Sequence, residues 1–137
     1  MNFEITDEIK KEDEEVIFQG LLKYNLARIE DKNPKDIAIY LRNEKDEITA
    51  GLTGDTHGNW LSVKFLWVSE ELRHSGIGSK ILAQAEEEAK RRGCKYCFLD
   101  TFSFQAPEFY KKHGYKEVFK LENYPITGKR YYFTKTL

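Results

Sequence analysis

The sequence lacks long apolar runs, a surplus of charge of one sign, and more than two cysteines. No apolar run approaches the roughly 20 residues that a membrane-spanning helix needs. The N-terminus has no basic region followed by an apolar stretch, so we expect no secretory signal, no membrane partner and a cytoplasmic location. Repeats, linkers and low-complexity segments are also absent, and we expect one domain over residues 1–137.

The net charge of −1 provides no concentrated basic surface, so we expect no nucleic-acid partner. The charge is nevertheless unevenly divided. Residues 1–68 carry 14 acidic and 9 basic side chains, whereas residues 69–137 carry 9 acidic and 13 basic ones. Solvated surface charge can account for this division. A basic C-terminal half would also favour a polyanion, and an acidic N-terminal half a cation.

The two cysteines, Cys94 and Cys97, form a single C-x-x-C pattern. A structural zinc site needs a second ligand pair, so we expect no metal. A redox pair would sit at a helix N-terminus, which lowers the pKa of a thiol. Here the pair follows Gly93 and leads into the apolar segment Tyr96–Leu99. We therefore expect two reduced, partly buried thiols.

Hydrophobic periodicity predicts an α/β fold. The expected strands are Phe3–Thr6, Ile37–Leu41, Ile48–Gly54, Trp60–Val68, Tyr96–Asp100, Tyr115–Leu121 and Arg130–Thr134. The second, third and fourth of these are joined by short polar turns and predict an antiparallel meander. The glycines of the third strand indicate a bulge or a close neighbour.

Three helices are expected: Glu12–Ile29, a helix that ends at Gly93, and Pro107–Lys112. The middle helix has one apolar face, formed by Ile77, Ile81, Leu82, Ala85 and Ala89. Its opposite face carries acidic and basic residues four apart, which predict the ion pairs Glu86/Lys90, Glu87/Arg91 and Glu88/Arg92.

The turn before this middle helix ends in Gly76-Ile77-Gly78. Two glycines let several backbone N–H groups point into one concavity, and the helix N-terminus beyond them favours an anion such as a pyrophosphate. A P-loop would need Lys-Ser or Lys-Thr after the last glycine, and a dinucleotide fingerprint would need three glycines in a parallel unit. Neither pattern fits.

Arg73-x-x-Gly76-x-Gly78, after an apolar strand that ends at Val68, resembles the acetyl-CoA signature of the GNAT superfamily of N-acetyltransferases. The segment Phe109–Tyr115 resembles that family's late aromatic-Tyr-x-x-x-Gly-aromatic helix and turn, and the order of elements also agrees. The resemblance implies a mixed sheet of about six to seven strands with an antiparallel N-terminal meander, flanked by about four helices. It also implies acetyl-CoA as acetyl donor.

The resemblance implies three sets of contacts with acetyl-CoA. Two strand residues would bond the pantetheine arm, the backbone of the turn would bind the pyrophosphate, and Ser103 would stand where many relatives have Asn. The implied residues are Leu66, Val68, Arg73, His74, Ser75, Gly76, Gly78, Ser79 and Ser103.

The resemblance also implies that Tyr110 is the general acid toward the departing CoA thiolate. A phenol with a pKa near ~10 would protonate a thiolate with a pKa near ~8.5 at a cost of roughly 2 kcal/mol. We therefore expect a hydrogen bond that strengthens as the sulfur gains charge. A tyrosine that only packs in the core is the alternative.

The expected activity is direct acetyl transfer to a primary amine of a small molecule or peptide, without a covalent enzyme intermediate. A catalytically silent acyl-CoA-binding module and a purely structural domain are the alternatives. Removing the proton of the amine needs a general base. Candidates for the base are Glu30, Asp55 and His57, and candidates for the acceptor pocket are Tyr24, Asn25, Trp60 and Trp67.

The aromatic strand Tyr131–Phe133 could pair with a second copy of the chain in a homodimer, or it could close the sheet.

Overall fold

The computed structural model describes residues 1–31 and 33–137. The chain divides into an N-terminal unit, Met1–Lys32, and a larger unit, Asn33–Leu137. The N-terminal unit contains the helix α1 (Lys11–Leu26), whose first turn holds three acidic residues that complement the helix dipole.

The prediction of a strand at Phe3–Thr6 is wrong, because the first nine residues are neither strand nor helix. A four-residue segment forms a strand only when a neighbouring strand pairs with it.

The larger unit is built on a six-stranded sheet with the strand order β1-β2-β3-β4-β6-β5. The strands are β1 (Lys35–Arg42), β2 (Ile48–His57), β3 (Trp60–Val68), β4 (Tyr96–Phe102), β5 (Lys116–Glu122) and β6 (Lys129–Thr136). The predicted antiparallel meander of the first three strands is confirmed. β3 and β4 pair in parallel, and the remaining pairs are antiparallel, so the sheet is mixed as expected.

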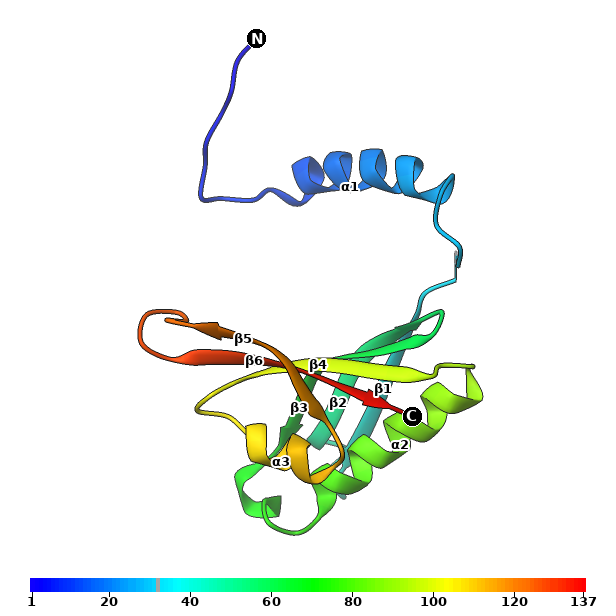
Figure 1. Cartoon of the computed structure of the whole chain (residues 1–137), viewed down its shortest axis with the longest axis vertical. Helices are drawn as coiled ribbons and strands as arrows, with labels where there is room; N and C mark the ends of the chain where they lie inside the picture. Colours follow the sequence, from blue (N-terminus) through cyan, green and yellow to red (C-terminus); the bar gives the residue numbers. More distant parts are fainter. Residues whose placement is uncertain (32) are drawn as a thin grey trace. The chain divides into compact units, whose positions relative to one another are not determined.

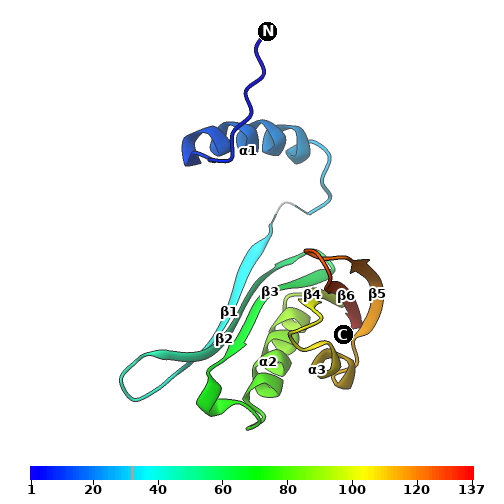
Figure 2. The same ribbon diagram turned by 90° about the vertical axis from the view of Figure 1, so that its left-hand side faces the viewer.

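Helices α2 (Ile77–Arg91) and α3 (Pro107–Lys112) lie on the same side of this sheet (Figures 1 and 2). The described residues thus hold three α-helices with α1, fewer than the four or so expected, and a short 3-10 turn, η1 (Glu70–Leu72), before α2. The apolar face of α2 is confirmed, since four of its five predicted residues are buried: Ile81, Leu82, Ala85 and Ala89. They pack on buried strand residues that include Leu52, Leu61, Leu99 and Phe133.

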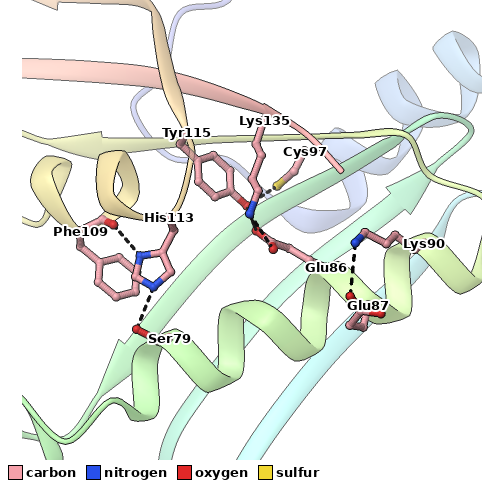
Figure 3. A network of polar contacts seen from close by, with 9 residues as sticks. All are labelled: Ser79, Glu86, Glu87, Lys90, Cys97, Phe109, His113, Tyr115 and Lys135. Carbon is pink, nitrogen blue, oxygen red and sulfur yellow. Dashed lines mark hydrogen bonds and ion pairs between the residues drawn. The ribbon is translucent and has the colours of Figure 1, made fainter.

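The outer face of α2 forms a different set of ion pairs from the predicted one. The Glu88–Arg92 pair is confirmed at 2.9 Å, but Lys90 pairs with Glu87 three residues earlier. The predicted Glu86/Lys90 and Glu87/Arg91 pairs are wrong. The Glu86 carboxylate instead accepts hydrogen bonds from the Tyr115 hydroxyl at 2.7 Å and the Lys135 ammonium at 2.9 Å (Figure 3). Groups brought in by the last two strands displace the local partner.

The pairing between β3 and β4 is short, and this opens the sheet. Only Trp60–Ser62 of β3 pairs with Tyr96–Phe98 of β4, and the two strands part beyond this point. The last six residues of β3 therefore pair with β2 on one side alone. Their other edge faces the region between α2 and α3, so the fold itself presents unpaired backbone there.

The expected irregularity in β2 lies at Gly54. The register between β2 and β3 shifts between Thr53 and Gly54. A Cβ atom on Gly54 would overlap the backbone carbonyl of Ser62 on β3. This approach of the two backbones explains why glycine occupies the position.

We expect Gly54→Ala to lower the free energy of unfolding by about 1–3 kcal/mol, because the added methyl group must push β3 away. Urea unfolding followed by circular dichroism measures the change. Thr53→Ala is the matched control on the same strand and should cost less than about 1 kcal/mol. Equal stabilities of Gly54→Ala and the wild type would contradict the close approach.

Candidate active site

The segment between β3 and α2 has the backbone shape needed to gather amide groups. His74 and Gly76 have φ angles of 64° and 84°, both in the left-handed region. Left-handed residues among right-handed ones turn successive N–H groups toward one side, as in anion-binding nests. A Cβ atom on Gly76 would have no neighbour within 4 Å, so glycine serves the backbone conformation there rather than close packing.

The backbone N–H groups of His74 to Ser79 donate to no other group of the described residues. The next N–H group, on Lys80, donates to the Gly76 carbonyl at 3.1 Å and begins the regular hydrogen bonding of α2. Arg73 differs from the prediction, because its N–H group already donates to the Glu70 carbonyl at 3.2 Å. Six consecutive unpaired amides at a helix N-terminus have the geometry that favours binding of an anion.

A cavity of about 720 Å³ lies beside this turn. It is lined by the end of β3, the turn, the first residues of α2, and the segment that leads into α3. The lining residues are Leu66, Trp67, Val68, Leu72, Arg73, His74, Gly76, Ile77, Gly78, Ser79, Phe104, Gln105, Ala106, Phe109 and Tyr110. Eight of the ten residues predicted for the site are among them, so the structure brings most of the predicted set to one cavity.

The two predicted residues outside the lining, Ser75 and Ser103, have other partners. The Ser75 hydroxyl donates to the Leu72 carbonyl. The Ser103 hydroxyl accepts a hydrogen bond from the Lys129 N–H group at 3.2 Å, which ties the end of β4 to β6. The free N–H group of Ser75 still belongs to the turn, whereas the geometry gives Ser103 no contact with the cavity.

The side chain of Arg73 lines the cavity and also supports its wall. Its Nε–H group donates to the Val68 carbonyl at 3.2 Å, so the guanidinium is fixed at the end of β3. A fixed guanidinium next to the free amides adds positive charge to the anion site.

Tyr110 lies on α3 and is 8% exposed. Its hydroxyl makes no hydrogen bond with the described residues, and the residue lines the cavity. Burial, reinforced by the nearby charges of Cys97 and Asp100, raises the pKa of Tyr110 to about 12. The hydroxyl is therefore a neutral donor that remains available to a ligand.

The sequence did not predict that Phe109 and the residues 104–106 line the cavity. The ring of Phe109 covers Gly78, where a Cβ atom would lie 3.5 Å from the ring, and it makes an edge-on contact with Tyr110 at 5.2 Å between centroids. Gln105 holds the approach to α3, because its side-chain oxygen accepts a hydrogen bond from the Phe102 N–H group at 2.7 Å. The aromatic pair Phe109-Tyr110 was the available signal for this wall.

Sequence reasoning also named base candidates that do not line the cavity. Asp55 pairs with Ser62, and His57 with Trp60, at the hairpin end of β2 and β3. From there to Val68, at the cavity end of β3, the strand runs on the order of 20 Å. Of the predicted aromatic residues in this unit, Trp67 lines the cavity and Trp60 does not. Tyr24, Asn25 and Glu30 belong to the N-terminal unit.

Among residues 1–31 and 33–137 there is no group of three or more His, Cys, Asp or Glu side chains that could hold a metal ion. In the same residues no helix is long and apolar enough to span a bilayer.

A mixed sheet that parts beside a turn of unpaired amides, with a tyrosine in the same cavity, is the arrangement that the resemblance to the GNAT superfamily implies for an acyl-CoA-dependent transferase. Comparison with known proteins agrees. A sequence model of the acetyltransferase (GNAT) domain matches residues 34–117. An acetyltransferase of Agrobacterium fabrum is 40% identical over 118 residues, which are 86% of each chain. Blasticidin-S acetyltransferase of Streptomyces morookaense is 38% identical over 89 residues, 64% of this chain and 65% of that one.

The crystal structure of an acetyltransferase from Agrobacterium tumefaciens matches with a TM-score of 0.95, at 36% identity and over the whole of both chains. The chain belongs to the GNAT family of acetyltransferases. It is an N-acetyltransferase whose acetyl donor is acetyl-CoA.

We expect Gly78→Leu to weaken acetyl-CoA binding by about tenfold or more, because the longer side chain must displace the Phe109 ring or enter the cavity. Gly78→Ala is the matched control. Its Cβ atom would lie 3.5 Å from Phe109 and 3.7 Å from Val68, which is ordinary contact, so its affinity should stay close to that of the wild type. Isothermal titration calorimetry measures both, and wild-type affinity in Gly78→Leu would contradict the assignment of this turn.

Proposed function

We propose that the protein transfers the acetyl group of acetyl-CoA directly to a primary amine of a small molecule or peptide, without a covalent enzyme intermediate. The observation that carries the proposal is that one cavity is lined both by Tyr110 and by five of the six residues whose backbone amides have no partner, His74, Gly76, Ile77, Gly78 and Ser79. The amides suit the pyrophosphate at one end of acetyl-CoA, and the hydroxyl suits the thioester sulfur at the other.

The edge of β3 supports the proposed course of the pantetheine arm between these two ends. Leu66 and Val68 line the cavity on the stretch of β3 that has left β4. An amide-containing arm can therefore pair with the free edge of the strand, much as an added strand would. The Val68 carbonyl already accepts a hydrogen bond from Arg73, which leaves the groups nearer Leu66 for the arm.

The raised pKa of Tyr110 defines its proposed role. With the pKa at about 12 and a thiol near ~8.5, full proton transfer to the departing thiolate is uphill by roughly 5 kcal/mol. This is a larger barrier than a phenol of ordinary pKa would face. Tyr110 therefore acts by donating a hydrogen bond that strengthens as negative charge develops on the sulfur. Protonation of the thiolate comes afterwards from solvent.

The cysteines support direct transfer. Both are buried thiols that form no disulfide in the described residues, and neither lines the cavity. Burial raises the pKa of the Cys97 thiol to about 12, and its sulfur lies 3.2 Å from the Tyr115 oxygen, which can accept from the S–H group. Since the thiolate is the nucleophilic form of cysteine, Cys97 is a poor candidate for an acetyl-enzyme intermediate. The amine would attack the thioester itself.

The name of one relative, blasticidin-S acetyltransferase, supports a small-molecule acceptor. We expect a panel of small amines and short peptides with free N-termini to contain at least one acceptor for which CoA thiol release rises well above the rate without amine. The same panel contains blasticidin S and an aminoalkylphosphonate, because the names of two relatives, blasticidin-S acetyltransferase and aminoalkylphosphonate N-acetyltransferase, contain these compounds. Mass spectrometry should show one added acetyl group on the acceptor and none on the protein. An acetylated protein that transfers the group onward would overturn direct transfer.

Acetyl-CoA at 100 times its dissociation constant should stabilise the fold by about 2.7 kcal/mol, which raises the melting temperature by several degrees. We expect this shift to persist in Tyr110→Phe, whereas its turnover should fall about tenfold to a hundredfold. The reason is that the hydroxyl acts on charge that is present only in the transition state. Equal losses of acetyl-CoA affinity and turnover would contradict this role for Tyr110.

A further inference from the structure

His113 lies directly after α3 and contacts two residues that line the cavity (Figure 3). Its ring atom Nδ1 is 2.7 Å from the Phe109 carbonyl, and Nε2 is 2.8 Å from the Ser79 hydroxyl on the first turn of α2. The imidazole and Phe109 rings are also in contact, with 4.4 Å between centroids. His113 itself does not line the cavity.

The chemistry of these partners fixes the direction of each hydrogen bond in the neutral ring. A carbonyl only accepts, so Nδ1 carries the proton and donates it to Phe109. Nε2 is then an acceptor, and the Ser79 hydroxyl donates to it. The hydroxyl of Ser79 is thus used between the two elements, while its backbone N–H group remains free for the cavity.

We propose that His113 is a positioning residue that holds α3 against the start of α2, so that Tyr110 and the free amides keep the separation that acetyl-CoA requires. This inference rests on the proposed function of the cavity. The pyrophosphate and the thioester belong to one molecule, so both ends of acetyl-CoA fit only when the two elements are at the right distance. Ser79–His113 is the side-chain hydrogen bond that joins the start of α2 to the end of α3 in the described residues.

Loss of the His113 link should affect long and short ligands differently. ADP carries a diphosphate but no pantetheine arm or thioester, so it should contact only the turn and the start of α2. Acetyl-CoA also reaches the wall formed by Phe109 and Tyr110. Loss of the His113 link should therefore weaken the long ligand and spare the short one.

The test compares acetyl-CoA and ADP by isothermal titration calorimetry in the full-length protein. His113→Phe keeps a ring against Phe109 but has no nitrogen atoms. It loses the bond to the Phe109 carbonyl on α3 as well as the Ser79 bond that links the two elements. We expect its dissociation constant for acetyl-CoA to rise about three- to tenfold, the range of the one lost link between α2 and α3, and its constant for ADP to stay within about twofold. Ser79→Ala keeps the backbone N–H group and should show the same pattern, which tests the same bond if His113→Phe fails to fold.

His113→Gln supplies an amide oxygen that can accept from Ser79, so it should recover most of the lost acetyl-CoA affinity. Lys112→Ala changes an exposed neighbour on α3 and should bind both ligands like the wild type. Turnover with the best amine of the panel should fall more in His113→Phe than the affinity does. Equal weakening of both ligands, or of neither, would overturn the positioning role. A wild-type protein that binds neither ligand would overturn the proposed function, and this inference with it.

Discussion

Six backbone N–H groups at the start of α2 have no partner in the described chain, and the rest of the site depends on them. An unpaired N–H group that is removed from water costs free energy, so such a row persists only where solvent or a ligand satisfies it. The left-handed residues His74 and Gly76 keep these groups turned to one side. The turn therefore has unsatisfied donors, and these are the groups that we propose bind the diphosphate of acetyl-CoA.

The sheet contributes the second requirement, an exposed strand edge that leads from the turn toward the tyrosine. β3 ends at the turn, and it has already parted from β4 when it arrives there. α3 lies on the same side of the sheet as α2 and closes the far wall with Phe109 and Tyr110 (Figures 1 and 2). A long ligand with a charged end and a reactive end fits such an arrangement, because each end meets a different element. This is also why the contact between His113 and Ser79 matters for the chemistry.

Burial decides which polar side chains near the cavity can react. Cys97, Tyr115 and Glu86 form a connected group with Lys135 beneath the sheet (Figure 3). Burial raises the pKa of both the Cys97 thiol and the Tyr115 phenol, so both stay protonated near neutral pH. Tyr110 is also buried and neutral, but its hydroxyl has no partner in the described residues, and the residue lines the cavity. The Tyr115 hydroxyl already donates a hydrogen bond to Glu86, whereas the Tyr110 hydroxyl has no such partner and can donate to a ligand.

Short-range sequence patterns predicted most of the strands and helices and several residues of the candidate site. The sequence located all six strands and α2 and α3. The apolar face of α2 is periodic because that face is buried in the core, whereas α3 was predicted from Pro107 at its start and Gly114 after its end. The Gly76-x-Gly78 pattern predicted an anion site, and the structure gives Gly76 the left-handed backbone conformation that glycine adopts most readily. Tyr110 was recognisable from the aromatic pair and the glycine that follows it.

Tertiary structure decided what depends on residues far apart in the sequence. The partner of Glu86 comes from the last strands rather than from its own helix. Asp55 and His57 looked like base candidates until the register placed them at the opposite end of β3 from the cavity. The contact between His113 and Ser79 joins residues 34 positions apart. Such contacts carry no periodic or local signal, because they arise only when separate elements pack together.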